Sequence, residues 1–338
     1  MYKYPILIYL FVSIIAASAQ DHKPTAPELL DQFAETVDRF NSFRIVSKSK
    51  MDIGLLGEKY KTLTMTEIYC YDKKNKRFSE RYLKWGHLPL YPSLDPPPLT
   101  TAGQPPLEYT PEDNARYGSR IKIGGKHTRK CAIPDVNGKK TGYASINTDE
   151  RSTQFRPNEV GHRCVVGPIM GYLTMANPER IDTLLRKANI LSVMDSMEEV
   201  AGSLCYVIEA VTDDGWQRLW IDPHHGHNIA KAEIEGLRRS DTRYKVCLKN
   251  IEFEQIDGAW TAIAFERERR DIRDDGIVFV ENTYTTILEL SINPDHKTLR
   301  SFDFDDIREG AQIKVIGKRG EERSINYIWQ NGKPVPKG

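Results

Sequence analysis

The chain has 338 residues, with 48 basic and 47 acidic residues and a formal net charge of +1. This balance gives no general electrostatic field to attract phosphate backbones or anionic lipid head groups, so nucleic-acid binding is disfavoured. The length allows one large sheet domain or two smaller ones, with ample chain to form a core.

The N-terminus carries the pattern of a secretory signal peptide. Lys3 precedes an apolar run from Ile6 to Ile15, and Ala17-Ser18-Ala19 forms a small-x-small cleavage site. The run is shorter than the roughly 20 residues that span a bilayer. We therefore expect residues 1–19 to be removed and the protein to be exported to the periplasm. Gln20 follows the cut in place of a lipid-accepting Cys, and no later segment is apolar enough to cross a membrane.

Helical spacing recurs in two segments. Residues 26–43 place apolar side chains on one helix face behind Thr25, a candidate cap, and Pro27 in the first turn. Residues 177–200 begin with Asn177-Pro178, which is also a typical helix start, and continue with a broad apolar face. We expect a helix in each segment.

Alternation with a period of two predicts strands through most of the remaining chain. In the last of these strands, Val278 to Ile292, the even-numbered side chains are mainly apolar, whereas Glu281, Thr283 and Thr285 have the opposite parity. This pattern predicts one apolar and one wet face. The expected strands are 60–71, 77–85, 205–211, 217–222, 229–235, 244–253, 260–267 and 278–292, with turns at 73–76, 138–142, 213–215, 257–258 and 274–276.

Two segments stand apart from this meander. Eight prolines between residues 86 and 114 predict an extended surface excursion, which is either a lid or a passive insertion. Residues 317–338 are expected to form a C-terminal tail. The predicted fold is mainly β with helices (α+β): a large curved antiparallel sheet, or unclosed β-barrel, covered by helices. A single domain should span residues 20–316.

The five cysteines do not form a CxxC pair, so no zinc knuckle or thioredoxin-type site is indicated. Three of them lie in apolar strand-like runs, where either core packing as free thiols or a disulfide is compatible with the pattern. The cysteines are Cys70, Cys131, Cys164, Cys205 and Cys247, of which the first and the last two lie in such runs.

Candidate catalytic and metal sites are weak. His224, His225 and His227 lie beside Asp222 between two strand patterns, which favours a solvated hairpin tip over a metal site. The acidic residues from Asp303 to Glu309 lack the spacing of a calcium loop. Cys164 lies two residues after His162, but a catalytic Cys usually meets its base in space. With no GxSxG, phosphate loop or HExxH, we expect neither an enzyme nor a cofactor.

Five motifs follow one another along the chain: ELLDQFAETVDRFNSF from Glu28, KNKRF from Lys74, DVNGKKTGY from Asp135, WIDPHHGHNIAK from Trp220 and FDFDDIREGAQI from Phe302. Their order resembles the outer-membrane lipoprotein carrier superfamily, the LolA/LolB-like proteins, over about residues 28–313. That resemblance implies an unclosed antiparallel barrel with an apolar cavity for acyl chains, and it makes Arg77 the match to a strand-borne arginine that helps ligand release. Here Phe78 replaces the proline that follows the family's basic pair.

A long sheet with an apolar face must cover that face by closure, by helices or by a ligand. We therefore expect an envelope protein that binds a lipid, acyl chain or lipoprotein. The alternatives are a non-catalytic interaction module that has no cavity and binds an envelope protein, and a metal-dependent hydrolase at the histidine turn. The expected cavity lining comprises Trp85, Trp220, Tyr284, Leu288 and Leu290.

Overall fold

The computed structural model describes residues 23–75, 77–85, 118–123, 126–129, 141–147, 167–173, 179–237, 242–303, 307–316 and 325–336. The expected signal peptide, the proline-rich excursion, Cys131 and Cys164 lie outside the described residues.

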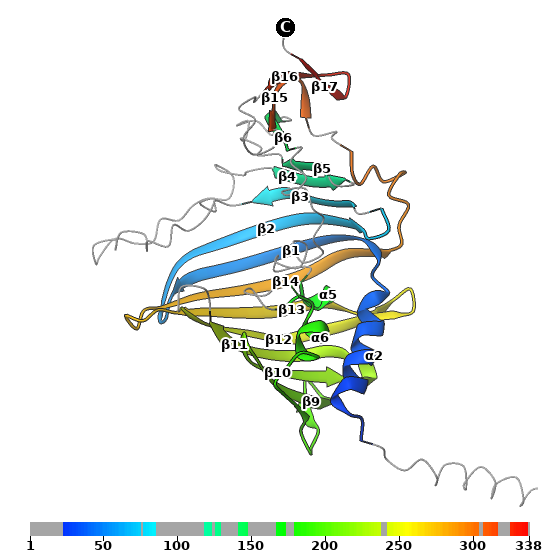
Figure 1. The fold of residues 1–338 in the computed structure, drawn as a ribbon. Coiled ribbons are helices and arrows are strands. Elements are labelled where there is room, and N and C mark those ends of the chain that lie inside the picture. Colours follow the sequence, from blue (N-terminus) through cyan, green and yellow to red (C-terminus); the bar gives the residue numbers. More distant parts are fainter. Residues whose placement is uncertain are drawn as a thin grey trace, which may run out of the picture.

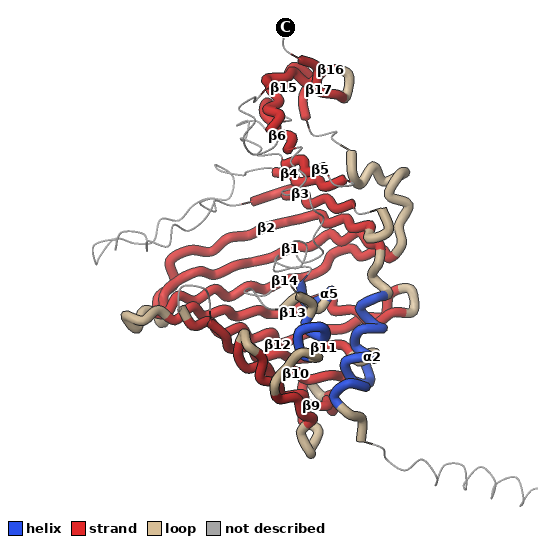
Figure 2. Tube along the Cα trace, in the orientation of Figure 1, coloured by secondary structure: helices blue, strands red, loops and turns tan. Residues whose placement is uncertain are grey.

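Strands dominate the described part of the chain (Figures 1 and 2). Their bounds are β1 Ser42–Leu55, β2 Glu58–Asp72, β3 Arg77–Trp85, β4 Gly118–Ile123, β5 Lys126–Arg129, β6 Thr141–Asn147, β7 Ile190–Val193, β8 Glu198–Val200, β9 Ser203–Thr212, β10 Gly215–Asp222, β11 Asn228–Leu237, β12 Arg243–Ile256, β13 Ala259–Ile272, β14 Val278–Ile292, β15 Ile307–Ile316, β16 Ile325–Gln330 and β17 Lys333–Pro336. The helices are α2 Ala26–Asp38, α5 Gly167–Met170, α6 Ile181–Leu185 and the 3₁₀ turn η1 Pro223–His225.

The strands form one large curved sheet (Figure 1). From one end the pairing order is β17, β16, β15, β6, β5, β4, β3, β2, β1, β14, β13, β12, β11, β10 and β9, and both β7 and β8 pair with β9. Among the described strands no pairing joins the two ends, so the sheet is unclosed, as expected. All pairings between described strands are antiparallel except that of β6 with β15, which are far apart in the sequence.

The chain leaves the first helix earlier than predicted. Thr25 and Glu28 form a reciprocal capping box at the start of α2, which ends at Asp38 instead of Phe43. Asn41 Nδ2 donates to the carbonyl of Asp38 at 2.5 Å, and β1 begins at Ser42. The sequence reading missed β1, whose alternation of buried and exposed side chains includes serines and lysines.

The predicted helix over residues 177–200 is wrong beyond its first turns. Within residues 179–200, the described part of this segment, only Ile181–Leu185 is helical, and the following residues form β7 and β8. Both strands pair with β9, which would otherwise be an unpaired sheet edge. Tertiary pairing therefore overrides the helical spacing in this segment.

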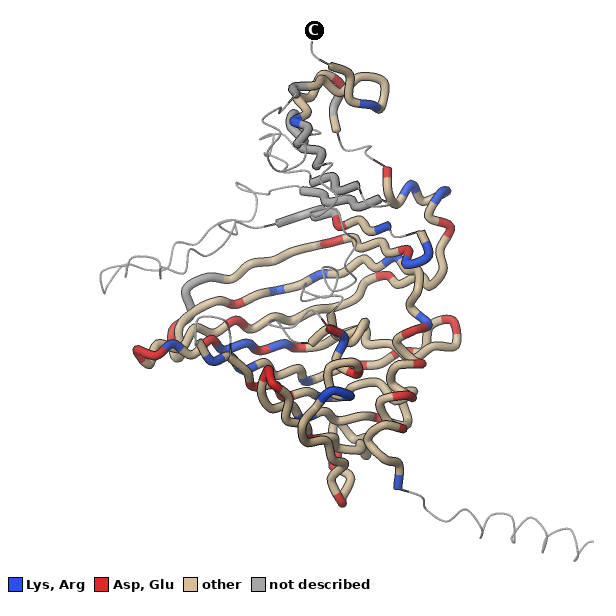
Figure 3. Tube along the Cα trace, viewed as in Figure 1, with Lys and Arg blue, Asp and Glu red and all other residues tan. Residues whose placement is uncertain are grey.

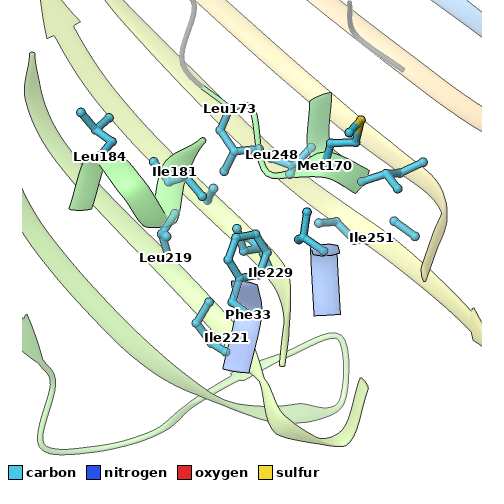
Figure 4. Packing of buried hydrophobic residues seen from close by; sticks show 14 of the residues in the cluster. Phe33, Met170, Leu173, Ile181, Leu184, Leu219, Ile221, Ile229, Leu248 and Ile251 are labelled. Carbon is cyan, nitrogen blue, oxygen red and sulfur yellow. The ribbon is translucent and has the colours of Figure 1, made fainter. Parts of the chain in front are cut away.

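Helices α2, α5 and α6 pack against one face of the sheet, which we call the inner face (Figures 1 and 4). Phe33 of α2 is 1% exposed and lies in the same cluster as Leu219 and Ile229 from β10 and β11. The Phe33 ring also lies against Gly171, where an added Cβ would come within 2.9 Å of it and where φ is +74°. These contacts make the helix-covered half of the sheet the main hydrophobic core.

A β-bulge at Leu288 explains why the predicted parity of β14 fails. Ser47 of β1 pairs with Ile287, and the preceding Val46 pairs with Glu289, so Leu288 is the extra residue. Ile287 and Leu290 therefore both pack against the main core despite their opposite parity. The even-numbered residues before the bulge are on the outer face.

The residues expected to form a C-terminal tail include regular structure. β16 and β17 form a hairpin through Asn331-Gly332, both with positive φ, which suits a tight two-residue turn. Trp329 of β16 packs with three apolar residues of β15 in a cluster separate from the main core. This cluster comprises Trp329, Ile307, Ala311 and Ile313, with Tyr327 packed against it.

Candidate ligand-binding face

A small apolar cluster lies on the inner face apart from the helix-covered core. Met51 of β1 and Leu63 and Met65 of β2 are each at most 6% exposed, and Ile53 packs against them. Met51 pairs with Leu63 in the β1–β2 ladder, so their side chains lie together on the same face. We call Met51, Leu63 and Met65 the methionine cluster.

Polar side chains continue the inner face from β1 across β14 to β13, and we call this set the polar strip. By register, the odd-numbered residues of β1 from Phe43 to Ile53 share one face, and Phe43 and Ile45 fix it as the inner face. All members are buried or nearly buried. The polar strip comprises Ser47 and Ser49 of β1, Thr283, Thr285 and Glu281 of β14, and Arg267, Arg269 and Asp271 of β13.

Part of the polar strip is internally satisfied. Ser49 and Thr285, whose hydroxyl oxygens are 3.1 Å apart, share a hydrogen bond across β1 and β14. Arg267 donates to Glu281 at 3.4 Å, and Arg269 Nη1 lies 3.8 Å from the same carboxylate. Arg269 also donates to Asp271. The two guanidinium groups are thus matched by two carboxylates.

Two other hydroxyls of the polar strip, in contrast, are not satisfied by the described residues. Ser47 is 0% exposed and Thr283 is 1% exposed, and neither hydroxyl has a hydrogen-bond partner among the described residues. A buried polar atom without a partner costs roughly 1–3 kcal/mol, and native proteins usually satisfy such atoms with protein, water or ligand. Within the polar strip, the hydroxyls of Ser47 and Thr283 are therefore the groups that most need a partner.

Buried acidic groups lie on the adjacent strands. The Tyr69 hydroxyl is 3.2 Å from a carboxylate oxygen of Glu67 and 3.2 Å from one of Glu80. Glu67 and Glu80 are only 3% and 1% exposed, and Glu67 pairs with Ser47 across β1 and β2. The side of the inner face next to Ser47 therefore carries carboxyl groups.

The structure describes the side chains of four of the five residues expected to line a cavity, and it separates these four. Leu290 packs against the main core, whereas Tyr284 and Leu288 are 41% and 55% exposed on the outer face. Trp220 belongs to a second cluster on the outer face, where its indole N–H donates to Glu198 at 2.8 Å. The backbone of Trp85 ends β3, and its side chain lies outside the described part. Trp220, Tyr284 and Leu288 thus do not line the inner face, because the bulge and the strand alternation place them opposite it.

Arg77, the arginine suggested by the resemblance, forms a local pair. Its Nη2 donates to Asp72 at 2.6 Å, and its guanidinium lies over the ring of Phe302, 4.5 Å from the centroid. Burial opposes ionisation of Asp72, but hydrogen bonds from Asn75 and Arg77 outweigh it and hold the pKa of the carboxyl below its usual value. A role of Arg77 in ligand release remains a prediction.

The histidine turn is a hairpin, as expected, but it is not a solvated tip. His225 Nδ1 donates to Asp222 at 2.6 Å, Ser203 donates to the other carboxylate oxygen at 2.9 Å, and the His224 N–H also donates to it at 2.9 Å. Burial opposes ionisation of Asp222, yet these hydrogen bonds, that of His225 first, lower the pKa of its carboxyl. The turn is therefore pinned by a buried carboxylate.

Helix α2 and two aromatic rings complete the surroundings of the turn. The ring of His225 stacks on Phe253 at 4.9 Å and meets the Trp260 ring edge-on at 4.8 Å. Thr36 of α2 donates to the carbonyl of Gly226 at 2.5 Å. In the part of the chain that the structure describes, no group of three or more His, Cys, Asp or Glu is placed to hold a metal ion.

The described cysteines are free thiols. Cys70 and Cys205 are buried, and burial, assisted by nearby Asp222, raises the pKa of Cys205 to about 12. Burial also raises the pKa of Cys247. The raised pKa values keep Cys205 and Cys247 as thiols at neutral pH, which is typical of core residues and unlike nucleophiles.

Comparisons with known proteins give similarity of structure at low sequence identity. No family model matches the chain. No curated protein matches its sequence. No helix in the described residues is long and apolar enough to span a bilayer.

Among solved structures, the chain is similar to a LolA superfamily protein from Nitrosomonas europaea, with 12% identity and a TM-score of 0.40, covering 84% of this chain and 99% of that one. It is also similar to MucB of Pseudomonas aeruginosa in its complex with MucA, with 10% identity and a TM-score of 0.24, covering 80% and 99%. A lipovitellin structure gives 8% identity and a TM-score of 0.25, covering 75% and 25%. The chain thus resembles divergent LolA-like proteins, at TM-scores too low to support an argument about function.

Proposed function

We propose that this chain is an exported envelope protein that binds the acyl chain of a lipid or lipoprotein on its inner face and performs no chemistry. The observation that carries this proposal is the methionine cluster. It consists of buried apolar side chains on the inner face, separate from the core that α2, α5 and α6 cover. Apolar side chains of this kind suit the contacts that an acyl chain makes in a binding site.

The chemistry of the cluster fits a flexible ligand. Methionine side chains are unbranched and polarizable, so they adapt to chains of varying shape. Two of the three residues of the cluster are methionines, and Ile53 extends it along β1. The proposed periplasmic location follows from the signal-peptide pattern at residues 1–19 and places the protein where lipids and lipoproteins are transferred.

The test is displacement of a fluorescent fatty acid from the delipidated mature protein, with Met51→Trp as the variant. A bulky indole in the proposed acyl site should weaken fatty-acid binding at least tenfold, equivalent to about 1.4 kcal/mol. Lys50→Trp is the matched control, because the neighbouring Lys50 side chain is exposed and points to the outer face. Circular dichroism checks that both variants fold.

The outcomes separate the proposal from an interaction module that binds an envelope protein without a lipid. Wild-type protein that takes up no fatty acid, with no acyl-chain mass after gentle purification, would support the interaction module and contradict the carrier. Equal binding by wild type and Met51→Trp would place the acyl chain elsewhere. If Met51→Trp fails to fold, Met65→Ala replaces it and should also lower affinity.

A further inference from the structure

The methionine cluster and the polar strip meet along one line of the inner face. Met51 pairs with Leu63 on one side and with Thr283 on the other. Ser49 likewise lies between Met65 and Thr285. Paired side chains on neighbouring strands lie about 5 Å apart. The apolar part of one ligand can therefore contact the methionine cluster while its polar part contacts the polar strip.

The two unsatisfied hydroxyls lie on this boundary. Ser47 and Met51 are four residues apart on the same face of β1, a separation of about 13 Å along the strand. Thr283 lies beside Met51, and the satisfied Ser49–Thr285 pair lies between the two unsatisfied hydroxyls. A glycerol head group is shorter than this separation, so one head group can contact Thr283, beside Met51, but not Ser47 at the same time.

The charges around the hydroxyls disfavour an ionised head group of either sign. Glu67 lies across from Ser47, and Glu281 lies two residues from Thr283 on the same face, so a ligand carboxylate or phosphate would meet carboxyl groups. Arg267 lies across from Thr283, so an ammonium group would meet a guanidinium. The nearby guanidinium and carboxylate groups are already matched with one another, and the groups that lack a partner are neutral hydroxyls.

We infer that the ligand of the inner face is an uncharged amphiphile of the monoacylglycerol class, with its hydroxylated head group at Thr283 and its acyl chain on the methionine cluster. This inference rests on the proposed function and specifies the class of lipid. Hydroxyl groups donate and accept, so a glycerol head group can satisfy the Thr283 hydroxyl without introducing a buried charge.

The experiment compares 1-monopalmitoylglycerol with palmitate, which have the same acyl chain, as competitors of a fluorescent acyl probe on the delipidated mature protein. We expect the monoacylglycerol to bind at least tenfold more tightly. Thr283→Val removes only the hydroxyl from an almost isosteric side chain. It should weaken monoacylglycerol binding about fivefold to tenfold and change palmitate binding less than twofold.

Two further variants guard against a change in folding. Thr286→Val is the same substitution on the same strand at an exposed position of the outer face, and it should leave both affinities unchanged. Thr283→Ser keeps the hydroxyl and should retain most of the preference for the monoacylglycerol. If Thr283→Val weakens monoacylglycerol binding and Thr283→Ser loses the preference as well, the effect comes from altered packing and not from the lost hydrogen bond. That result would overturn the inference.

The remaining outcomes distinguish this inference from the proposed function. If palmitate binds as tightly as the monoacylglycerol, or if Thr283→Val lowers both affinities equally, the head-group assignment is wrong and acyl-chain binding stands. If neither lipid binds, both the assignment and the proposed function are wrong.

Discussion

The helix-covered half of the inner face and the strip along β1, β14 and β13 are built on the same sheet in opposite ways. In the first, Phe33 of α2 and strand residues such as Leu219 form one continuous apolar cluster. In the second, Ser47 and Thr283 are equally buried, but they are polar and lack hydrogen-bond partners among the described residues. The first region therefore supplies apolar packing that stabilises the fold, whereas the unpartnered hydroxyls of the second oppose stability.

The largest effect should come from the helix-covered half. Phe33→Ala removes a ring that is 1% exposed and packed between the sheet and Gly171, and it should lower the free energy of unfolding by about 3–5 kcal/mol. Urea unfolding monitored by circular dichroism measures this loss. Phe279→Ala is the control, because Phe279 lies at the far end of β14 and is only half-buried. An equal loss in the two variants would contradict the division into two regions.

The buried carboxylate of the histidine turn should give the next largest effect. Asp222→Asn keeps the shape but removes the charge that accepts from Ser203, His225 and the His224 N–H. We expect a loss of about 1–3 kcal/mol of unfolding free energy. Asp275→Asn provides the comparison, since Asp275 is exposed and its partners, the Ile277 N–H and the Arg273 guanidinium, are both local. A negligible loss for Asp222→Asn would show that the turn is not pinned by this carboxylate.

The pH dependence of Asp222 has a definite sign. Its folded-state pKa is lowered, so its carboxylate stabilises the fold above its ordinary pKa, near 3.8, and this contribution is lost as the pH falls toward the lowered value. Acid titration of wild type and Asp222→Asn should therefore converge at low pH. A difference that persists unchanged to the lowest pH would contradict the hydrogen-bond network.

A smaller effect is expected at His296, which joins the segment after β14 to the first strands. Its ring nitrogens lie 3.0 Å from the hydroxyls of Ser42 and Ser301, and Nε2 donates to the carbonyl of Tyr71 at 3.1 Å. Burial lowers the pKa of His296. Neutral His296 is therefore favoured in the fold, and stability is lost as the pH falls from about 6.5 toward the lowered folded-state pKa.

His296→Gln should make stability less sensitive to pH between 7.5 and 5, as measured by thermal unfolding at both values. The counterpart is His224→Gln, because His224 is exposed on the histidine turn. If both variants keep the full wild-type pH dependence, another group titrates in this range.

The smallest expected effect on stability is at the polar strip. Thr283→Val replaces a buried hydroxyl that lacks a described partner, so the ligand-free protein should be unchanged or slightly stabilised, by less than about 1 kcal/mol. The same assay as for Phe33→Ala measures it. A loss comparable to that of Phe33→Ala would mean that Thr283 belongs to the structural core.

The sequence predicted the architecture well where local signals and tertiary pairing agree. The hairpin at Asp257-Gly258 formed as expected, with positive φ at both residues, and β14 has the predicted bounds Val278–Ile292. The prediction of a helix over residues 177–200 was wrong, because the apolar spacing of this segment also suits two short strands that pair with β9. Period alone does not distinguish these outcomes.

The candidate site was predictable only in part. Glu281, Thr283 and Thr285 share a parity that the sequence assigns to a wet face, yet they are on the inner face and are mostly buried. The missing information is the bulge at Leu288, which inserts one residue without a glycine or proline to mark it. The pairing of Met51 with Thr283 depends on a contact between distant strands, which no local pattern specifies.

The central claim is that the inner face binds an acyl chain beside the methionine cluster. Native mass spectrometry of the gently purified mature protein tests it most directly, with Met51→Trp measured in parallel. We predict acyl-mass adducts that organic extraction removes from the wild type and that are depleted in Met51→Trp. A clean ligand-free mass for the wild type, with no uptake of added 1-monopalmitoylglycerol or palmitate, would contradict the claim.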